Sequence, residues 1–215
     1  MDADRPEQVL VLAKAPVPGR VKTRLHTAYT PEDAAALADA ALRDTLDATA
    51  ICRARRRLVA LDGEAGSWSS DDLEVVAQVP GSFAQRLDGA WSHVTGPCVQ
   101  IGMDTPQVTP ALLDEGLEAL THPRIDAVLG PALDGGWWAL GLPAPVPGVF
   151  DGVAMSADDT GDQQLATLRR LGLRVHLLPT LRDLDRPDDV TAIAAAHPHL
   201  RVSILARELA AGANP

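Results

Sequence analysis

Short apolar runs alternate with amphipathic segments along this chain of 215 residues. The apolar runs are typical of buried strands, and the amphipathic segments are typical of helices. Several of the helical segments begin with a capping residue before proline, as at Thr30-Pro31 and Thr109-Pro110. This alternation predicts an α/β fold with a mixed, mostly parallel sheet that is covered by helices on both faces. We expect strands at about residues 9–13, 58–61, 73–79, 98–104, 125–129, 137–142 and 173–178, and helices at about 31–50, 82–94, 109–120, 158–171, 186–196 and 200–211.

Length and composition suggest how the chain is organised. Residues 1–8 are polar and acidic, so we expect a polar N-terminal tail followed by a single domain over residues 9–215. The sequence has no apolar run long enough to span a membrane, and its beginning is unlike a secretory signal. The two cysteines, Cys52 and Cys98, are too few for a disulfide framework or a zinc site. We therefore expect a cytoplasmic protein with free thiols, whose oligomeric state the sequence leaves open.

The loop after the first strand is the most unusual stretch of the chain. It carries Lys14, Arg20, Lys22 and Arg24, and it holds both lysines of a sequence that has 19 Lys and Arg residues in total. A compact ammonium group suits a phosphate in a way that arginine does not reproduce. The net charge of −10 argues against a protein that tracks nucleic-acid phosphates. A local positive site in an acidic protein therefore predicts a small anionic ligand.

Isolated aspartates follow two other apolar runs. Asp104 stands where an apolar strand meets Thr105-Pro106, and it could either hold a divalent cation or cap the next helix. Asp183 and Asp185 flank Leu184, and in an extended chain their side chains lie on one face and could reach one Mg²⁺. Capping of the helix that begins near residue 186 explains Asp185 equally well, but does not explain Asp183.

The Asp134-Gly135-Gly136 segment lies between two predicted strands. The two glycines suit a tight hairpin, or they allow a ligand to approach the backbone while Asp134 accepts hydrogen bonds from its hydroxyl groups. Phosphate-loop, dinucleotide-binding and nucleophile-elbow motifs are absent from the sequence. The unusual stretches all follow strands, and ligands of open α/β sheets bind beyond the carboxyl ends of the strands. We therefore expect the functional site at that edge.

Four stretches together resemble a known family. They are AKAPVPGRVKTRL at 13–25, IGMDTP at 101–106, GPALDGGWW at 130–138 and LRDLDRPDDV at 181–190. They are similar to the motifs of GT-A-like glycosyltransferases that are often called radical-SAM/selenodomain-associated transferases. The order of motifs is also similar to that of the guanylyltransferases of deazaflavin-cofactor biosynthesis. The resemblance implies a Rossmann-like GT-A fold, as in nucleotide-diphospho-sugar transferases.

The resemblance also implies roles for individual residues. Lys22 and Arg24 would hold nucleotide phosphates, Lys22 and Asp104 would be catalytic, and Arg86 would contact a phosphate or support the site. Two departures from the family pattern, at 81–84 (GSFA) and 155–157 (MSA), lie where an acceptor would be gripped, so the substrate is not carried over. The full candidate set is Ala13, Lys14, Ala15, Gly19, Arg20, Lys22, Thr23, Arg24 and Arg86 for the nucleotide, Asp134, Gly135 and Gly136 for the substrate, and Asp104, Asp183 and Asp185 for Mg²⁺ or Mn²⁺.

Three functions remain open from the sequence. The first is a Mg²⁺-dependent transferase that moves a sugar from a nucleoside diphosphate to a small acceptor. The second is a nucleotidyltransferase that joins a nucleoside triphosphate to a phosphorylated small acid, with Lys22 stabilising the transition state. The third is a nucleotide-binding module without turnover.

Overall fold

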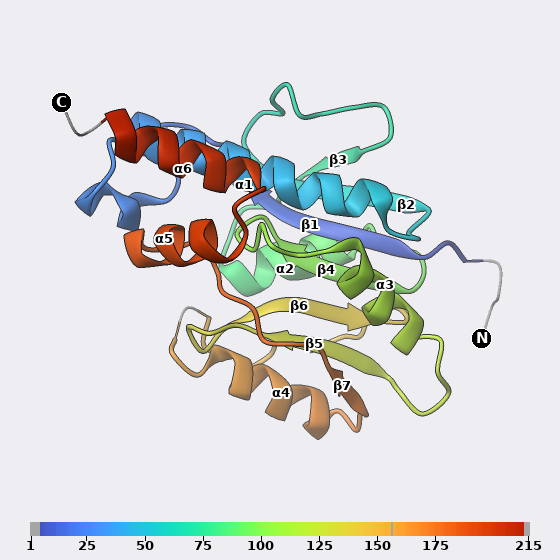
Figure 1. Ribbon diagram of the computed structural model, residues 1–215. Coiled ribbons are helices and arrows are strands. Elements are labelled where there is room, and N and C mark those ends of the chain that lie inside the picture. Colours follow the sequence, from blue (N-terminus) through green and yellow to red (C-terminus); the bar gives the residue numbers. More distant parts are fainter. Residues whose placement is uncertain (1–4, 156, 213–215) are drawn as a thin grey trace.

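The computed structural model describes residues 5–155 and 157–212, and a seven-stranded sheet forms its centre (Figure 1). The strand order is β3-β2-β1-β4-β6-β5-β7. The strand β6 pairs antiparallel with β4 and with β5, and the other four pairings are parallel. These pairings confirm the predicted α/β fold with a mixed, mostly parallel sheet. The strands are β1 (Gln8–Lys14), β2 (Arg56–Asp62), β3 (Glu74–Ala77), β4 (Cys98–Gly102), β5 (Ala127–Pro131), β6 (Trp137–Leu142) and β7 (Val175–Leu177).

The helices begin at capping residues that the sequence displays. Thr30 and Asp33 form a reciprocal capping box, in which each side chain accepts a hydrogen bond from the other residue's backbone N–H. Thr109 accepts from the backbone N–H of Leu112 and so caps α3. The helices are η1 (Thr23–Thr27, a 3-10 turn), α1 (Pro31–Ile51), α2 (Phe83–Trp91), α3 (Pro110–Ala119), α4 (Thr160–Arg170), α5 (Pro187–Ala196) and α6 (Arg201–Gly212).

Helices cover both faces of the sheet, because alternate residues of the central strands point to opposite sides. Val9 and Val11 of β1 belong to a core shared with α1 and α3. Leu10, between them, belongs to a second core shared with α2 and α4. All three side chains are buried, so β1 is the apolar centre of both layers.

The helix α6 packs against the outer side of α1, and α5 packs against α6 and η1, so the apolar cluster among them includes no strand residue (Figure 1). Asp44 of α1 is buried and accepts hydrogen bonds from the backbone N–H groups of Arg201 and Val202. An acceptor from another helix thus satisfies the first free N–H groups of α6. Leu184, in the segment before α5, belongs to the same apolar cluster, and it lies between the predicted site residues Asp183 and Asp185.

The expected N-terminal tail, residues 1–8, overlaps the first strand by one residue. β1 begins at Gln8, the last residue of that tail, and the Gln8 side chain is fully buried. Residues 1–4 lie outside the described part of the chain.

None of the described helices combines the length and the hydrophobicity needed to cross a bilayer.

Candidate active site

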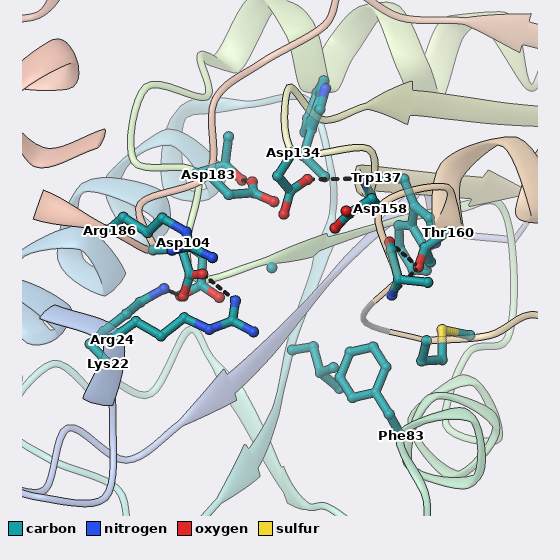
Figure 2. Close-up of a pocket in the computed structure, with 18 of the residues that line it drawn as sticks. Lys22, Arg24, Phe83, Asp104, Asp134, Trp137, Asp158, Thr160, Asp183 and Arg186 are labelled. Carbon is teal, nitrogen blue, oxygen red and sulfur yellow. Dashed lines mark hydrogen bonds and ion pairs between the residues drawn. The ribbon is translucent and has the colours of Figure 1, made fainter. Parts of the chain in front are cut away.

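A cavity of about 320 Å³ opens at the carboxyl ends of the parallel strands, where the sequence predicts a site (Figure 2). The loops after β1, β4 and β5 and the segment before α5 all reach it. A second cavity, of about 360 Å³, lies beside it. The residues that line both cavities are Leu12, Lys22, Arg24, Phe83, Gly102, Asp104 and Asp185. The four motifs that are scattered along the sequence therefore meet at one edge of the sheet.

Lys22 is held in an uncommon backbone conformation at this edge. With φ 49° and ψ 42° it is the one non-glycine residue with positive φ among those that the structure describes. Its neighbours Val21 and Leu25 are buried and anchor the loop. The Lys22 side chain is only 7% exposed, and its Nζ lies 2.6 Å from Oδ1 of Asp104. A strained backbone that aims a buried ammonium group into a cavity is typical of a functional residue.

Asp104 does not cap the next helix, because Thr109 does so. The capping alternative for Asp185 is wrong as well: Asp189 accepts from the backbone N–H of Arg186 at the start of α5. The Asp185 carboxylate instead forms an ion pair with Arg24. Each of these two aspartates thus has its side chain in the cavity and pairs with a cation of the segment at the end of β1, residues 14–24, which we call the β1 loop.

The segment from Asp183 to Asp185 is fixed by the residue between the two acids. Leu184 is fully buried, and its backbone N–H donates to the carbonyl of Asp104 at 2.7 Å. With Leu184 held in this way, the carboxylates of Asp183 and Asp185 both lie on the side of the cavity. This is the arrangement that the i, i+2 spacing of the two residues predicts for an extended chain. Asp183 also accepts a hydrogen bond of 2.8 Å from the hydroxyl of Thr105.

The pKa of Asp183 is raised to about 6, chiefly by burial of the carboxyl group. The carboxylates of Asp104 and Asp134 also raise it, whereas the hydrogen bond from Thr105 and the ammonium group of Lys22 lower it. Carboxylate oxygens are the ligands that Mg²⁺ and Mn²⁺ prefer, so the chemistry of Asp104, Asp183 and Asp185 fits a divalent cation. Within the described residues, no three His, Cys, Asp or Glu side chains form a ready metal-binding group. Such an ion would therefore need further oxygens, and the phosphates of a nucleotide commonly supply them.

Asp183→Asn should stabilise the ligand-free protein. A carboxyl whose pKa rises on folding favours the folded state at low pH, and stability falls as the pH rises through about 4 to 6. Above pH 7 the ionised side chain costs about 3 kcal/mol, which Asn avoids while still accepting from Thr105. We expect a higher melting temperature for Asp183→Asn than for wild type at pH 8, and a smaller difference at pH 4.

The control is Glu208→Gln, which removes an exposed carboxylate of α6. It should leave the melting temperature within error at both pH values. Equal melting temperatures of Asp183→Asn and wild type at pH 8 would contradict the account of a destabilising buried carboxylate.

The Asp134-Gly135-Gly136 segment is a hairpin, and its glycines approach the protein's own backbone. A side chain on Gly135, which has φ +88°, would collide with the carbonyl oxygen of Asp158. The backbone N–H of Gly161 donates to the carbonyl of Gly135 at 2.8 Å. Gly135 thus packs on the start of α4, whereas Gly136 lines the first cavity. The approach of a ligand to these two glycines stays a prediction. The packing of the hairpin on α4 brings Asp134 and Asp158 to the same cavity (Figure 2).

The second cavity gathers most of the predicted nucleotide-binding residues. Beside Arg86 lies Gln78, whose Nε2 donates to the carbonyls of Ala13 and Ala60. Ala15 and Gly19 line neither cavity: Ala15 is buried and Gly19 forms an exposed turn with φ +74°. The predicted residues in this cavity are Ala13, Lys14, Arg20, Lys22, Thr23, Arg24 and Arg86.

Sequence reasoning misses several residues of the first cavity. From the sequence, Arg186 is only the start of a helix, and Asp158 is only part of one. Phe83 and Met155 are visible only as departures from the family pattern, and Ser156, between Met155 and Ala157, lies outside the described residues. The missed residues that line the cavity are Leu12, Phe83, Gln100, Gly102, Thr105, Trp137, Trp138, Met155, Ala157, Asp158, Thr160 and Arg186.

Comparison with solved structures defines the class of fold. A protein from Desulfovibrio desulfuricans G20, provisionally described as a nucleotide-diphospho-sugar transferase, is 27% identical over 95% of each chain with a TM-score of 0.85. A nucleotidyl transferase from Methanothermobacter is 15% identical, with a TM-score of 0.56 over 87% of this chain and 95% of that one. Together with the sheet and the position of the cavity, these neighbours define a Rossmann-like GT-A fold.

A third neighbour was solved with ligands. It is glucosyl-3-phosphoglycerate synthase from Mycobacterium tuberculosis, in complex with Mn²⁺, uridine diphosphate and glucosyl-3-phosphoglycerate. It is 13% identical, with a TM-score of 0.55 over 88% of this chain and 76% of that one. At this identity the likeness concerns the fold alone.

The chain belongs to the family described as "uncharacterized protein conserved in bacteria" (DUF2064), which matches residues 17–157. A comparison with curated proteins gave no match. The matched region begins within the β1 loop and includes Lys22, Asp104 and Asp134, but it ends before Asp183 and Asp185.

Proposed function

We propose that this protein is a divalent-cation-dependent transferase that binds a nucleotide-diphospho-sugar and moves the sugar to a small acceptor. The observation that carries the proposal is the pairing of Lys22 with Asp104 at one edge of the sheet, with Arg24 and Asp185 paired beside them. Cations and carboxylates that alternate around one cavity match the charges of a diphosphate and its metal ion. The neighbours that use nucleotides or sugar nucleotides support the same function.

Each residue has a part in this proposal. Lys22 and Arg24 bind the diphosphate oxygens and stabilise the negative charge that develops on the leaving nucleoside diphosphate. Asp104, Asp183 and Asp185 would hold Mg²⁺ or Mn²⁺, which supplies further positive charge at the diphosphate when bound. Asp134 accepts hydrogen bonds from hydroxyl groups of the substrate. The residues after β1 and Arg86 line the second cavity, in which we place the nucleoside.

Nucleotidyl transfer is the second candidate, and the burial of Lys22 favours it specifically. A nearly buried ammonium group suits the pentacoordinate transition state at the α-phosphate of a nucleoside triphosphate. In this case the acceptor is a phosphorylated small acid. The associations with radical-SAM or deazaflavin pathways that the sequence motifs imply stay predictions.

Product analysis separates the two reactions. The protein is incubated with Mn²⁺ and either sugar nucleotides or nucleoside triphosphates, together with candidate acceptors. Sugar transfer releases a nucleoside diphosphate, whereas nucleotidyl transfer releases pyrophosphate. We expect acceptor-dependent release of the nucleoside diphosphate. Release of pyrophosphate would instead identify a nucleotidyltransferase, and binding without release of either product would identify a binding module.

A further inference from the structure

The end of the first cavity away from its cations has a different chemical character. In Figure 2, Lys22, Arg24 and Arg186 lie at one end of the cluster, and Phe83, Trp137 and Thr160 lie at the other. Trp137 and Met155 pack against the buried core between the sheet and the α2 and α4 helices. That core therefore continues to the wall of the cavity.

The aromatic residues of this wall are held in place. The ring of Trp137 stacks on that of Phe150, with the centroids 6.4 Å apart and the planes 14° from parallel. Phe83 is the first residue of α2, and 37% of it is exposed in a chain that has only two phenylalanines. An exposed ring at the mouth of a polar cavity is available to an apolar group of a ligand.

Among the described residues that line the first cavity, those at this end carry negative charge only. The charged side chains that line it are Asp134 and Asp158, and Oδ1 of Asp134 accepts from the backbone N–H of Gly136 at 2.9 Å. Phe83 lines both cavities, and the guanidinium of Arg86 lies 5.2 Å from its ring centre. Arg86 lines the second cavity and not the first, and it donates to Gln78. Of the first cavity's lining residues that the structure describes, a phosphate or carboxylate beside Trp137 and Asp158 would find carboxylates, while the cations of that cavity lie at its other end. A hydroxyl group would find acceptors for its hydrogen bond.

We infer that the acceptor is an uncharged alcohol with an apolar, preferably aromatic, body. This inference rests on the proposed function. The apolar body lies between Phe83 and Trp137, and its hydroxyl faces Asp158. In the transfer, the hydroxyl oxygen bonds to the anomeric carbon, and the bond from that carbon to the diphosphate oxygen breaks. The hydroxyl proton passes to the Asp158 carboxylate, and the nucleoside diphosphate leaves with the bonding electron pair.

Three matched probes test this acceptor class: 2-phenylethanol, phenylacetate and 2-phenylethyl phosphate. They share one phenyl body and differ in charge. Their dissociation constants are measured by calorimetry or ligand-observed NMR on the whole protein, saturated with Mn²⁺ and with the nucleotide that stabilises it most. We expect the alcohol to bind at least about tenfold more tightly than the phosphate ester, since the ester meets only carboxylates at this end.

Variants of Phe83 locate the binding. Phe83→Ala should weaken the binding of the alcohol by about tenfold, because the ring of the probe loses its aromatic partner. Phe83→Lys should reverse the preference in favour of the phosphate ester. The matched control is Ile204→Ala, which removes an exposed apolar side chain of α6 outside both cavities. It should change none of the dissociation constants.

The outcomes separate the two proposals. Equal binding of the three probes, tighter binding of the phosphate ester, no binding of the alcohol, or indifference to Phe83 would overturn the acceptor class. A protein that no nucleotide stabilises would contradict the proposed function itself, and the probe series is then run without nucleotide.

Discussion

Lys22→Gln is expected to lower kcat/KM for transfer by about 10²- to 10³-fold, the usual effect of removing one preorganised group that stabilises transition-state charge. The reason is local. Lys22 carries the one nearly buried ammonium group of the β1 loop, its backbone is held at φ 49°, and its Nζ already lies 2.6 Å from Asp104. Glutamine has a similar length and can donate hydrogen bonds, but it brings no charge to the diphosphate. Steady-state kinetics with the sugar nucleotide measures the loss.

The other lysine gives a graded comparison. Lys14 lines only the second of the two cavities, its side chain is 42% exposed, and its Nζ lies 3.9 Å from Asp62. Lys14→Gln should therefore cost less than about tenfold, since an exposed charge contributes less than a buried one. Equal losses for the two variants would contradict the specific role that we assign to Lys22.

Gly135→Ala is expected to destabilise the protein by about 3 kcal/mol or more and to disrupt the acceptor end of the cavity. A Cβ atom on Gly135 would lie 1.7 Å from the carbonyl oxygen of Asp158, and this neighbour is backbone rather than a flexible side chain. The hairpin and the start of α4 would have to separate, which also breaks the hydrogen bond from Gly161. Urea unfolding monitored by circular dichroism measures the change in the free energy of unfolding.

Gly152→Ala separates backbone strain from the collision. Gly152 has a similar positive φ of +74°, but a Cβ atom there would have no neighbour within 4 Å. Its substitution should cost only the conformational penalty of about 1 kcal/mol. If Gly135→Ala were no more destabilising than Gly152→Ala, the close packing of the hairpin on α4 would not be a determinant of the site.

Much of the fold is encoded locally and could be predicted from the sequence. The strand and helix order follows from apolar periodicity and from caps such as Thr30 and Thr109, which act within a few residues of themselves. The hairpin between β5 and β6 is one of the alternatives predicted from the glycine pair, but the place of β6 beside β4 could not be derived in this way. It depends on the pairing of β6 with β4, a partner that lies far away in the sequence.

The phosphate and metal side of the site is also visible in the sequence, because its residues cluster within short motifs. The i, i+2 spacing by itself predicts that Asp183 and Asp185 lie on one side of Leu184. The acceptor end has no such signature. Phe83, Trp137 and Asp158 are single residues on three separate segments, and only tertiary packing brings them to one cavity. The packing of Gly135 on the backbone of Asp158 likewise leaves no local mark beyond a pair of glycines.

The central claim is that the β1 loop and the three aspartates bind a nucleotide diphosphate together with a divalent cation. A thermal-shift series with nucleoside diphosphates, triphosphates and sugar nucleotides, each with and without Mn²⁺, tests it most directly. A ligand at about 100 times its Kd should add roughly 2.7 kcal/mol, or roughly 5–10 °C for a chain of this size. We predict such a shift for a sugar nucleotide with Mn²⁺, and its loss in Asp104→Asn, whose ligand-free melting temperature should stay close to that of wild type. No shift with any nucleotide, or an equal shift in Asp104→Asn, would contradict the claim.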